Sequence, residues 1–314
     1  MGRACVLDER SLTERLDCAA AAHRLGVFVH LVRIMSSRAF AFILATALVA
    51  GLSPALAVVG GTTSQDVRGA RASTLRVETS RGELCSGAAI APELVLTAAH
   101  CLMGGGSVSV VSLDPRFRAR RHAVIAVLPH PSFVPGTTPR TQPGTDLAML
   151  RLAAPLPADI QPVTLGGGLW QGETVTMAGF GLSVEDNKKT ARRLRETRLV
   201  NAGNYTTQNT VKVAVDAEAK GESPGAGACR GDSGGPVLRG NAHSRDLVGI
   251  VSWSSGPLNS RARRICGGFT AITPVSEHRS WITEAAARLL AMGPNPRQLE
   301  REPPAAGYSW WFSR

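Results

Sequence analysis

The stretch ACRGDSGGPV, residues 228–237, sets a serine inside a glycine-rich turn. Gly231, Gly234 and Gly235 let the backbone turn tightly around Ser233. An alcohol is a poor nucleophile at neutral pH, so Ser233 needs a neighbouring base, and that base needs a third group to fix its tautomer. A nucleophilic Ser233 therefore requires a histidine and a carboxylate from elsewhere in the chain.

Two further motifs supply these groups. LTAAHC (96–101) contains His100, and DLAML (146–150) contains Asp146. The order His, Asp, Ser agrees with the chymotrypsin arrangement and differs from the subtilisin and α/β-hydrolase orders. The other histidines have no such partner motif. Together the three motifs are far more specific than any one of them.

On these motifs the chain resembles the chymotrypsin/trypsin-type serine peptidases, from VVGG (58–61) to the last helical pattern. The resemblance implies that Ser233 is the nucleophile, His100 the base and Asp146 its orienting group. It also implies an oxyanion hole formed by the N–H groups of Gly231 and Ser233. Behind the triad, Ser252 is expected to hydrogen-bond the aspartate and Trp253 to line the substrate groove.

Substrate preference is inferred from the pocket that the resemblance implies. Gly227 stands six residues before the nucleophile, at the base of the S1 pocket, so no carboxylate is there to pair with a buried Lys or Arg. We therefore expect an uncharged P1 residue, unless Glu222 folds inward. Ser254 is expected to narrow the pocket, and Gly268 to form its opposite wall. The expected pocket residues are Gly227, Ala228, Ser252, Trp253, Ser254 and Gly268.

The start of the chain predicts secretion. Residues 39–57, AFAFILATALVAGLSPALA, follow a short basic region and end in the Ala-Leu-Ala pattern of a signal-peptidase site. The alternative is an uncleaved membrane anchor. We expect residues 35–57 to be a signal peptide, with Met35 as initiator, and residues 1–34 to be a misassigned start or a cytoplasmic extension.

Cleavage after Ala57 removes two of the six cysteines and leaves four, an even number that suggests two disulfides in a secreted chain. Four cysteines allow three pairings, and their spacing does not choose among them. The family resemblance implies the pairs Cys85–Cys101 and Cys229–Cys266.

The same cleavage frees the amine of Val58. In the resembled family, an N-terminal amine released from a VVGG-like sequence pairs with the aspartate before the nucleophile, here Asp232. Since no propeptide separates Ala57 from Val58, we expect signal cleavage itself to activate the enzyme.

The body of the chain predicts an all-β fold. Short strand-like runs separated by Gly, Pro and Asp/Asn recur from residue 74 to residue 253. With the resemblance they imply two perpendicular six-stranded antiparallel β-barrels over residues 58–292, with the triad in the cleft between them. Apolar residues at three- and four-residue steps predict a C-terminal helix over 275–293, capped by Ser276 and ended by Gly293. Residues 293–314 are expected to form a Pro-rich tail.

Composition and charge exclude other classes. The chain is 44% hydrophobic and carries a net charge of +11, but its basic clusters lack the interleaved aromatics that stack nucleic-acid bases. Its Arg-, Ala- and Gly-rich composition is typical of a GC-rich genome, and we expect a bacterial member. No metal or organic cofactor is implied. The expected partners are polypeptide substrates and protein inhibitors. The rival hypothesis is an inactive secreted binding protein, for which bulky Arg230 at the cleft rim is the supporting feature.

Overall fold

A computed structural model describes residues 58–293 of the chain, except for 220–224, 241–244 and 258–263. The expected signal peptide, Glu222 and the tail beyond residue 293 lie outside the described residues. No helix among the described residues is long and apolar enough to span a bilayer.

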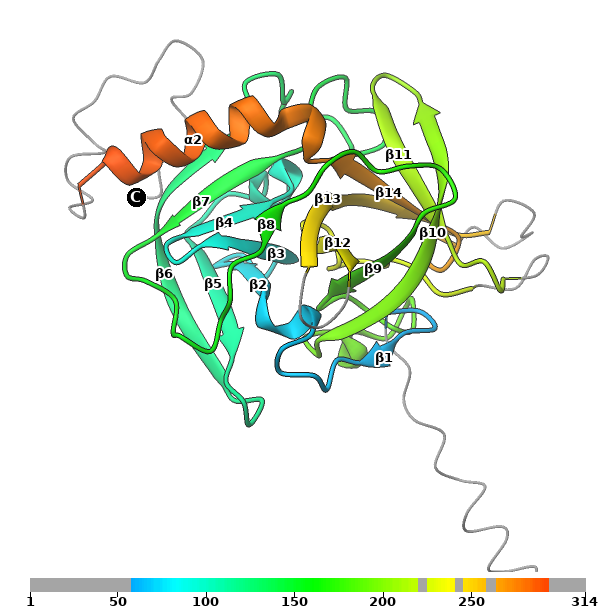
Figure 1. The fold of residues 1–314 in the computed structure, drawn as a ribbon, viewed down its shortest axis with the longest axis horizontal. Helices are drawn as coiled ribbons and strands as arrows, with labels where there is room; N and C mark the ends of the chain where they lie inside the picture. Colours follow the sequence, from blue (N-terminus) through cyan, green and yellow to red (C-terminus); the bar gives the residue numbers. More distant parts are fainter. Residues whose placement is uncertain (1–57, 220–224, 241–244, 258–263, 294–314) are drawn as a thin grey trace, which may run out of the picture. The chain divides into compact units, whose positions relative to one another are not determined.

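The first half of this region closes into a six-stranded antiparallel barrel with strand order β2-β3-β4-β7-β6-β5 (Figure 1). In β2 the side chains of Leu75 and Val77 are buried inside the barrel, alternating with charged Arg76 and Glu78, as a strand period of two requires. The strands are β2 (Thr74–Thr79), β3 (Leu84–Ala91), β4 (Leu94–Thr97), β5 (Val108–Leu113), β6 (Ala119–Pro129) and β7 (Ala148–Leu152).

The second half closes in the same way, because β9 pairs with both β10 and β12. The ring contains β9 (Thr174–Gly179), β10 (Arg195–Thr206), β11 (Thr210–Val215), β14 (Phe269–Pro274), β13 (Arg245–Ser255) and β12 (Pro236–Gly240). Two short strands extend this sheet: β1 (Thr62–Thr63) pairs with β10, and β8 (Thr164–Leu165) pairs with β13. The expected pair of six-stranded barrels is confirmed.

The sequence patterns missed β10, β12 and β14. The twelve residues of β10, RETRLVNAGNYT, contain two arginines, a glutamate and two asparagines. Its buried face includes Arg195 and Asn201 besides Leu199, so hydrophobic alternation alone does not reveal it. Pairing with β9, β11 and β1 stabilises this strand instead.

Four short 3-10 helices and one α-helix complete the described structure. The 3-10 helices are η1 (Ala70–Ala72), η2 (Ala99–Leu102), η3 (Lys188–Thr190) and η4 (Ser276–His278). Helix α2 (Arg279–Ala291) follows β14 of the second barrel and lies beside β7 of the first (Figure 1). It buries Ile282, Ala285 and Leu289, three of the five apolar residues that predicted the helix. Of the other two, Ala286 is half-buried and Val275 lies before the helix begins.

The predicted ends of this helix were wrong. Ser276 provides no side-chain cap, because residues 276–278 form the tighter turn of η4 before α2 begins at Arg279. The helix ends at Ala291, two residues before Gly293, with Met292 at its C-cap.

Candidate active site

His100 and Asp146 are brought together by the pairing of β4 with β7. Thr97 lies opposite Ala148 in this pair, so η2, which follows β4, meets the segment that precedes β7. His100 Nδ1 lies 2.8 Å from Asp146 Oδ2, and the backbone N–H of His100 donates to Oδ1 at 3.0 Å. The carboxylate therefore fixes both the ring and the backbone of the histidine.

In the His100–Asp146 pair, each residue favours the charged form of the other. Burial opposes the imidazolium, but the charge and hydrogen bond of Asp146 outweigh it and raise the pKa of His100 above 6.5. Burial likewise acts to raise the pKa of Asp146, but His100 and the hydroxyl of Ser252 hold it below its ordinary value. Asp146 is 2% exposed, so the carboxylate remains ionised in a site that water barely reaches.

Ser233 completes the group from the second barrel. Its hydroxyl donates to the carbonyl of Ser252 at 3.1 Å, and Ser252 Oγ donates to Asp146 Oδ2. In this rotamer the hydroxyl of Ser233 bonds Ser252 and not His100 Nε2. A turn about the Cα–Cβ bond of Ser233 redirects the hydroxyl, and hydrogen bonds of this kind often tighten only when substrate binds.

The turn around Ser233 is held by both barrels. On the first-barrel side, the N–H of Ser86 donates to the carbonyl of Ser233 at 2.7 Å, and Ser86 Oγ donates to the carbonyl of Gly231 at 2.9 Å. On the second-barrel side, the N–H of Gly234 donates to Val251 at 2.7 Å. Gly234 has φ of +81°, and a Cβ there would lie 2.1 Å from Thr97 Oγ1, so only glycine fits.

Asp232 is entirely buried beside this turn. Its carboxylate accepts the N–H groups of Gly181 at 2.8 Å and Cys229 at 2.9 Å. Burial raises the pKa of Asp232 to about 7, against the smaller opposing effects of these bonds and of the Arg195 charge. Within the described part of the chain, no cation lies within ion-pair distance of this carboxylate.

The VVGG segment lies against the loop that leads to the nucleophile. Val58 is 1% exposed, and the N–H of Gly227 donates to the carbonyl of Val59 at 2.9 Å. Val58 packs in one apolar cluster with Ala228 and Val251. The N-terminal segment and the Asp232 turn are thus parts of one packed region.

The residues expected to form the S1 pocket are spread over three segments that meet. A side chain at Gly227 would point toward Thr270 and Gly267. A Cβ added there would lie 3.4 Å from Thr270 Oγ1. Ser254 Oγ donates to the carbonyl of Ile265 at 2.7 Å, so this hydroxyl is bound to the pocket frame. Gly268 packs tightly on Gly256.

Two residues of the expected pocket set have their side chains engaged elsewhere. The hydroxyl of Ser252 is directed at Asp146, so only its backbone is free to face the pocket. Trp253 packs with Val211, Val213 and Ala271, and its ring lies under the guanidinium of Arg140, 4.9 Å from the centroid.

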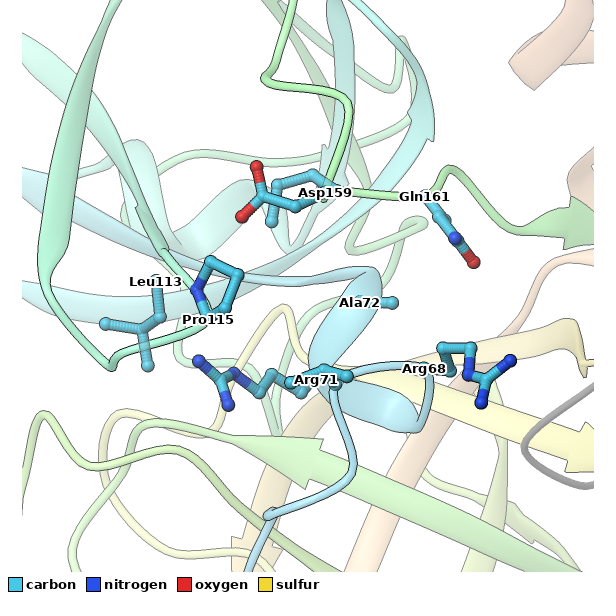
Figure 2. A pocket seen from close by; sticks show the side chains of 9 residues that line it. Arg68, Arg71, Ala72, Leu113, Pro115, Asp159 and Gln161 are labelled. Carbon is cyan, nitrogen blue, oxygen red and sulfur yellow. The ribbon is translucent and has the colours of Figure 1, made fainter.

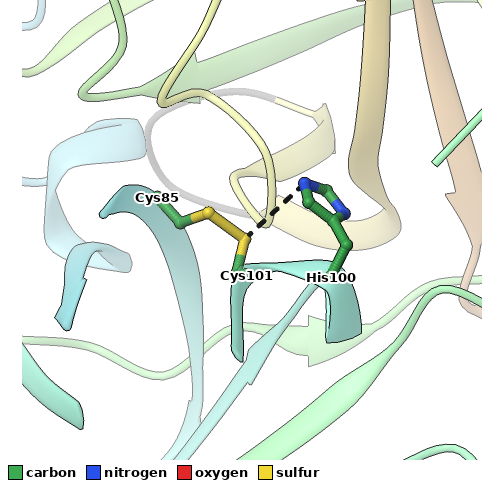
Figure 3. A group of neighbouring side chains, drawn as sticks. All are labelled: Cys85, His100 and Cys101. Carbon is green, nitrogen blue, oxygen red and sulfur yellow. Dashed lines mark hydrogen bonds between the residues drawn. A yellow bond between two sulfur atoms is a disulfide. The ribbon is translucent and has the colours of Figure 1, made fainter. Parts of the chain in front are cut away.

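Both expected disulfides are present. Cys85 pairs with Cys101, and Cys229 with Cys266. Figure 3 shows the first of these beside His100, whose Nε2 lies 4.0 Å from Cys101 Sγ. Cys85, His100 and Cys101 are close enough together to resemble a metal site, but sulfurs joined in a disulfide provide no thiolate ligands.

A separate cavity of about 170 Å³ lies between η1 and the end of β5. Arg71, Leu113, Pro115 and Asp159 line it (Figure 2). None of its lining residues belongs to the triad or the expected pocket, so it is not the candidate active site.

The family model named Trypsin matches residues 58–282. The chain belongs to the trypsin family. Residues 58–282 thus form a trypsin-family domain, with the barrels and disulfides described above.

Curated relatives agree with this trypsin-family assignment. Serine protease 56 of mouse and of human are each 28% identical to the chain and align with 77% of it. Mouse vitamin K-dependent protein C is 28% identical over 63% of the chain. The alignments cover 40%, 41% and 45% of these three proteins, so the chain spans less than half of their length. All three are mammalian, and the expected bacterial origin finds no support.

Solved structures agree in fold. The atomic-resolution structure of HBP is 23% identical with a TM-score of 0.57, and human heparin binding protein is 21% identical with the same score. Each alignment covers 76% of this chain and 99% of that protein. At these identities the similarity supports the trypsin-family fold alone.

Three residues that shape this trypsin-family site were not predicted from the sequence. Ser86 connects the turn around Ser233 to the first barrel. Gly179 and Gly181 leave space for Asp232, since a Cβ at Gly179 would lie 2.3 Å from Asp232 Oδ1. A signal for the glycines exists in the sequence, since GFG at 179–181 ends a strand-like run. Ser86 carries no local signal, because its partners lie 145 and 147 residues away along the chain.

Proposed function

We propose that this protein is a secreted serine endopeptidase that hydrolyses polypeptides through an acyl-enzyme. One observation carries the proposal: His100, Asp146, Ser252 and Ser233 are linked by hydrogen bonds where the two barrels meet. Such an arrangement is more specific to acyl transfer than any of these residues alone.

The reaction follows from the positions of these groups. The hydroxyl of Ser233 turns to His100, transfers its proton to Nε2 and forms a bond from Oγ to the substrate carbonyl carbon. Asp146, bound to Nδ1, stabilises the imidazolium. The imidazolium then protonates the leaving amine as the C–N bond breaks. Water, deprotonated by the same nitrogen, releases the acyl group and restores Ser233.

The negative charge of the tetrahedral intermediate is assigned to the amides of Gly231 and Ser233. Within the described residues neither N–H donates to another protein group, so both remain free for the substrate oxygen. Gly231 has φ of +96°, a backbone conformation that favours glycine. One such donor is typically worth about 3 kcal/mol of barrier.

An uncharged P1 side chain fits the pocket best. Gly227 faces a threonine hydroxyl and glycine backbone, and a Lys or Arg side chain buried there without a carboxylate would lose its hydration uncompensated. Library profiling of cleavage sites tests this preference. Fastest turnover of arginyl substrates would contradict it and point to Glu222.

Activation is proposed to occur when the signal peptide is removed after Ala57. Burial of Val58 beside the Asp232 region, and the absence of a described cation partner for this carboxylate, support the arrival of a positive amine there. In this proposal the chain is exported from the cell, and the mature peptidase begins at residue 58. Mass spectrometry of the secreted protein should find Val58 at the N-terminus of active enzyme.

The alternative is a binding protein that uses the same fold without turnover. Two similar structures are named for heparin binding, and Arg230 is exposed next to the proposed oxyanion hole. The alternative predicts no release of product from any peptide.

Acylation and turnover of the secreted protein decide between these functions. A serine-directed sulfonyl fluoride should label Ser233, and Ser233→Ala and His100→Ala should each lower kcat by at least about 10⁴-fold. His122→Ala is the matched control, because His122 bonds Ser112 away from the site. Full activity in Ser233→Ala, or no activity in the unmodified protein, would overturn the proposed function.

A further inference from the structure

Three arginines surround one carboxylate on the first barrel. Glu78 Oε1 accepts a hydrogen bond from Arg192 Nε at 3.0 Å, and Oε2 accepts one from Arg121 Nη2 at 2.7 Å. Arg76 Nε lies at ion-pair distance, 2.9 Å from Oε1. Arg76 and Glu78 lie on β2, Arg121 on β6, and Arg192 on the segment between β9 and β10. We name Arg76, Arg121 and Arg192, together with Glu78, the arginine cluster.

The arginine cluster carries a charge of +2 after Glu78 is counted. Among the described residues, Glu78 is the one carboxylate within ion-pair distance of any of the three. Each guanidinium has five N–H donors. Arg192 donates one of them to Glu78, while Arg121 donates one to Glu78 and one to Ser109. The side chains of Arg121 and Arg192 are 61% and 55% exposed, so the unused donors face solvent.

Glu78 holds these cations in place. Burial acts to raise its pKa, but the bonds to Arg192 and Arg121 and the charge of Arg76 outweigh burial and lower it. Glu78 is only 7% exposed. It therefore positions three guanidinium groups without neutralising them.

The arginine cluster is close to the nucleophile turn. Glu78 lies opposite Leu84 in the β2–β3 pair, and the side chain of Leu84 comes within 3.1 Å of a Cβ added at Gly231. From the other direction, the N–H of Arg192 donates to Phe180, and the N–H of Phe180 donates to Ser86 Oγ. Ser86 itself bonds the carbonyls of Gly231 and Ser233.

The arginine cluster and the proposed S1 pocket have no residue in common and are built by different segments. The pocket is built by Gly227, Ser254 and Gly268 of the second barrel, whereas the arginine cluster lies beyond Leu84 of the first. Leu84 lies beside Gly231 of the proposed oxyanion hole. If the acyl side chain of a substrate enters the pocket, we therefore expect the residues after the scissile bond to pass Leu84. Glu83, the nearest other acid on this hairpin, turns toward Gly104 and His100 instead.

We infer that the arginine cluster selects acidic side chains two or three residues after the scissile bond, an inference that rests on the proposed function. A substrate carboxylate takes the unused donors of Arg121 and Arg192 in charge-assisted, planar pairs. The carboxylate adds a second anion to three cations and relieves their mutual repulsion. A neutral residue leaves that repulsion in place, and a lysine increases it.

The expected preference is modest because the guanidinium groups are exposed. Exposed ion pairs contribute up to about 1 kcal/mol each, which is about fivefold in kcat/KM. Two acidic residues should therefore raise kcat/KM by about five- to twentyfold at low ionic strength, and salt should reduce this.

The test uses quenched-fluorescence peptides that share every residue up to the scissile bond. After it, they carry Glu-Glu, Gln-Gln or Lys-Lys at the second and third positions. A nitroanilide with the same acyl part, lacking these positions, reports turnover alone. In the secreted full-length protein, the Glu-Glu preference should fall to within about twofold in Arg121→Gln/Arg192→Gln, while nitroanilide hydrolysis stays unchanged. Arg198→Gln, an exposed arginine on β10 that does not contact Glu78, should keep the preference.

Hydrolysis of the nitroanilide without any Glu-Glu preference, or a preference that survives the double substitution, would overturn the inference and leave the proposed function intact. If nothing is hydrolysed, the proposed function fails, and binding of labelled peptides to Ser233→Ala still tests the arginine cluster. Equal affinity for the Glu-Glu and Gln-Gln peptides would overturn it. A third outcome would also overturn the inference. The protein would bind a sulfated polysaccharide, Arg121→Gln/Arg192→Gln would abolish that binding, and the Glu-Glu and Gln-Gln peptides would show equal affinity.

Discussion

The buried carboxylate of Asp146 controls the state of its neighbours. It accepts three hydrogen bonds, two from His100 and one from Ser252. Burial alone would favour its neutral form, but these partners keep its pKa low. The resulting negative charge holds Nδ1 of His100 protonated and leaves Nε2 available for the base role proposed above.

The rate of the proposed peptidase should therefore depend on pH through His100. A base acts only when neutral, and the pKa of His100 is raised above 6.5, so kcat/KM should fall as pH decreases through a value above 6.5. Asp146→Asn removes the anion and should move this limb to lower pH, with kcat lower by about 10⁴-fold. Asp159→Asn, whose carboxylate pairs with Arg120 at the surface, is the control. A limb that stays in place in Asp146→Asn would contradict this account.

Gly181 is a second residue on which the site depends, because the space that a Cβ would need there is occupied by Asp232. A Cβ there would lie 2.5 Å from Asp232 Cγ, so Gly181→Ala should displace the carboxylate and distort the adjacent turn. We expect kcat/KM to fall by at least about 100-fold, similar to the loss of one oxyanion donor. The control is Gly167→Ala, where the nearest atom is the flexible end of Arg239 at 4.0 Å. Equal activity of the two variants would show that the Asp232 turn tolerates displacement.

At the scale of elements, helix α2 is fixed by a side chain of the opposite barrel. Arg151 on β7 donates from Nη1 to the carbonyls of Leu289 and Met292, at the C-terminal end of the helix. Its Nη2 donates to Glu93 at 3.2 Å. A cation at this end satisfies orphan carbonyls and complements the helix dipole.

Arg151→Met should consequently destabilise the protein while preserving side-chain bulk. It leaves the two helix carbonyls and Glu93 without this donor, and we expect a loss of about 2 to 3 kcal/mol in the free energy of unfolding by urea. Arg288→Met, an exposed change on the same helix, should remain within about 0.5 kcal/mol. A similar effect of both substitutions would argue against the capping role.

At the scale of the whole molecule, the buried charge of Asp232 links the N-terminus to stability. Burial raises its pKa to about 7, compared with about 3.9 in an unfolded chain. The folded state with a blocked Val58 should then lose stability as pH rises from about 4 to 7, because the buried carboxylate must ionise. A protonated Val58 amine would offset this cost.

Chains that begin at Val58 and chains with one extra alanine before it should therefore diverge with pH. At pH 5 their free energies of unfolding should be similar. At pH 7.5 the chain with a free Val58 amine should be more stable, on the order of 3 kcal/mol. Above pH 8 this advantage should decline as the amine loses its proton in the folded state. Urea unfolding across this range checks the prediction, and parallel curves would contradict it.

The sequence predicted the class of fold and the candidate triad from its motifs, and the cysteine pairs through the family resemblance that those motifs carry. The motifs around His100, Asp146 and Ser233 are local strings, because each must shape the backbone immediately around a reacting group. The stripe of α2 was likewise visible, since its period is set by the helix itself. The catalytic roles of the triad and the P1 preference of the pocket remain predictions, which measurements of kcat and kcat/KM test.

Only the tertiary structure revealed the features that depend on distant strands. Strand β10 exists because neighbouring strands pair with it, although its own composition is polar. The room for Asp232 at Gly181, the cap of α2 by Arg151 and the bonds of Arg121 and Arg192 to Glu78 each join residues that are more than 40 positions apart. Such contacts follow from barrel closure and register, which fix distances that no local pattern encodes.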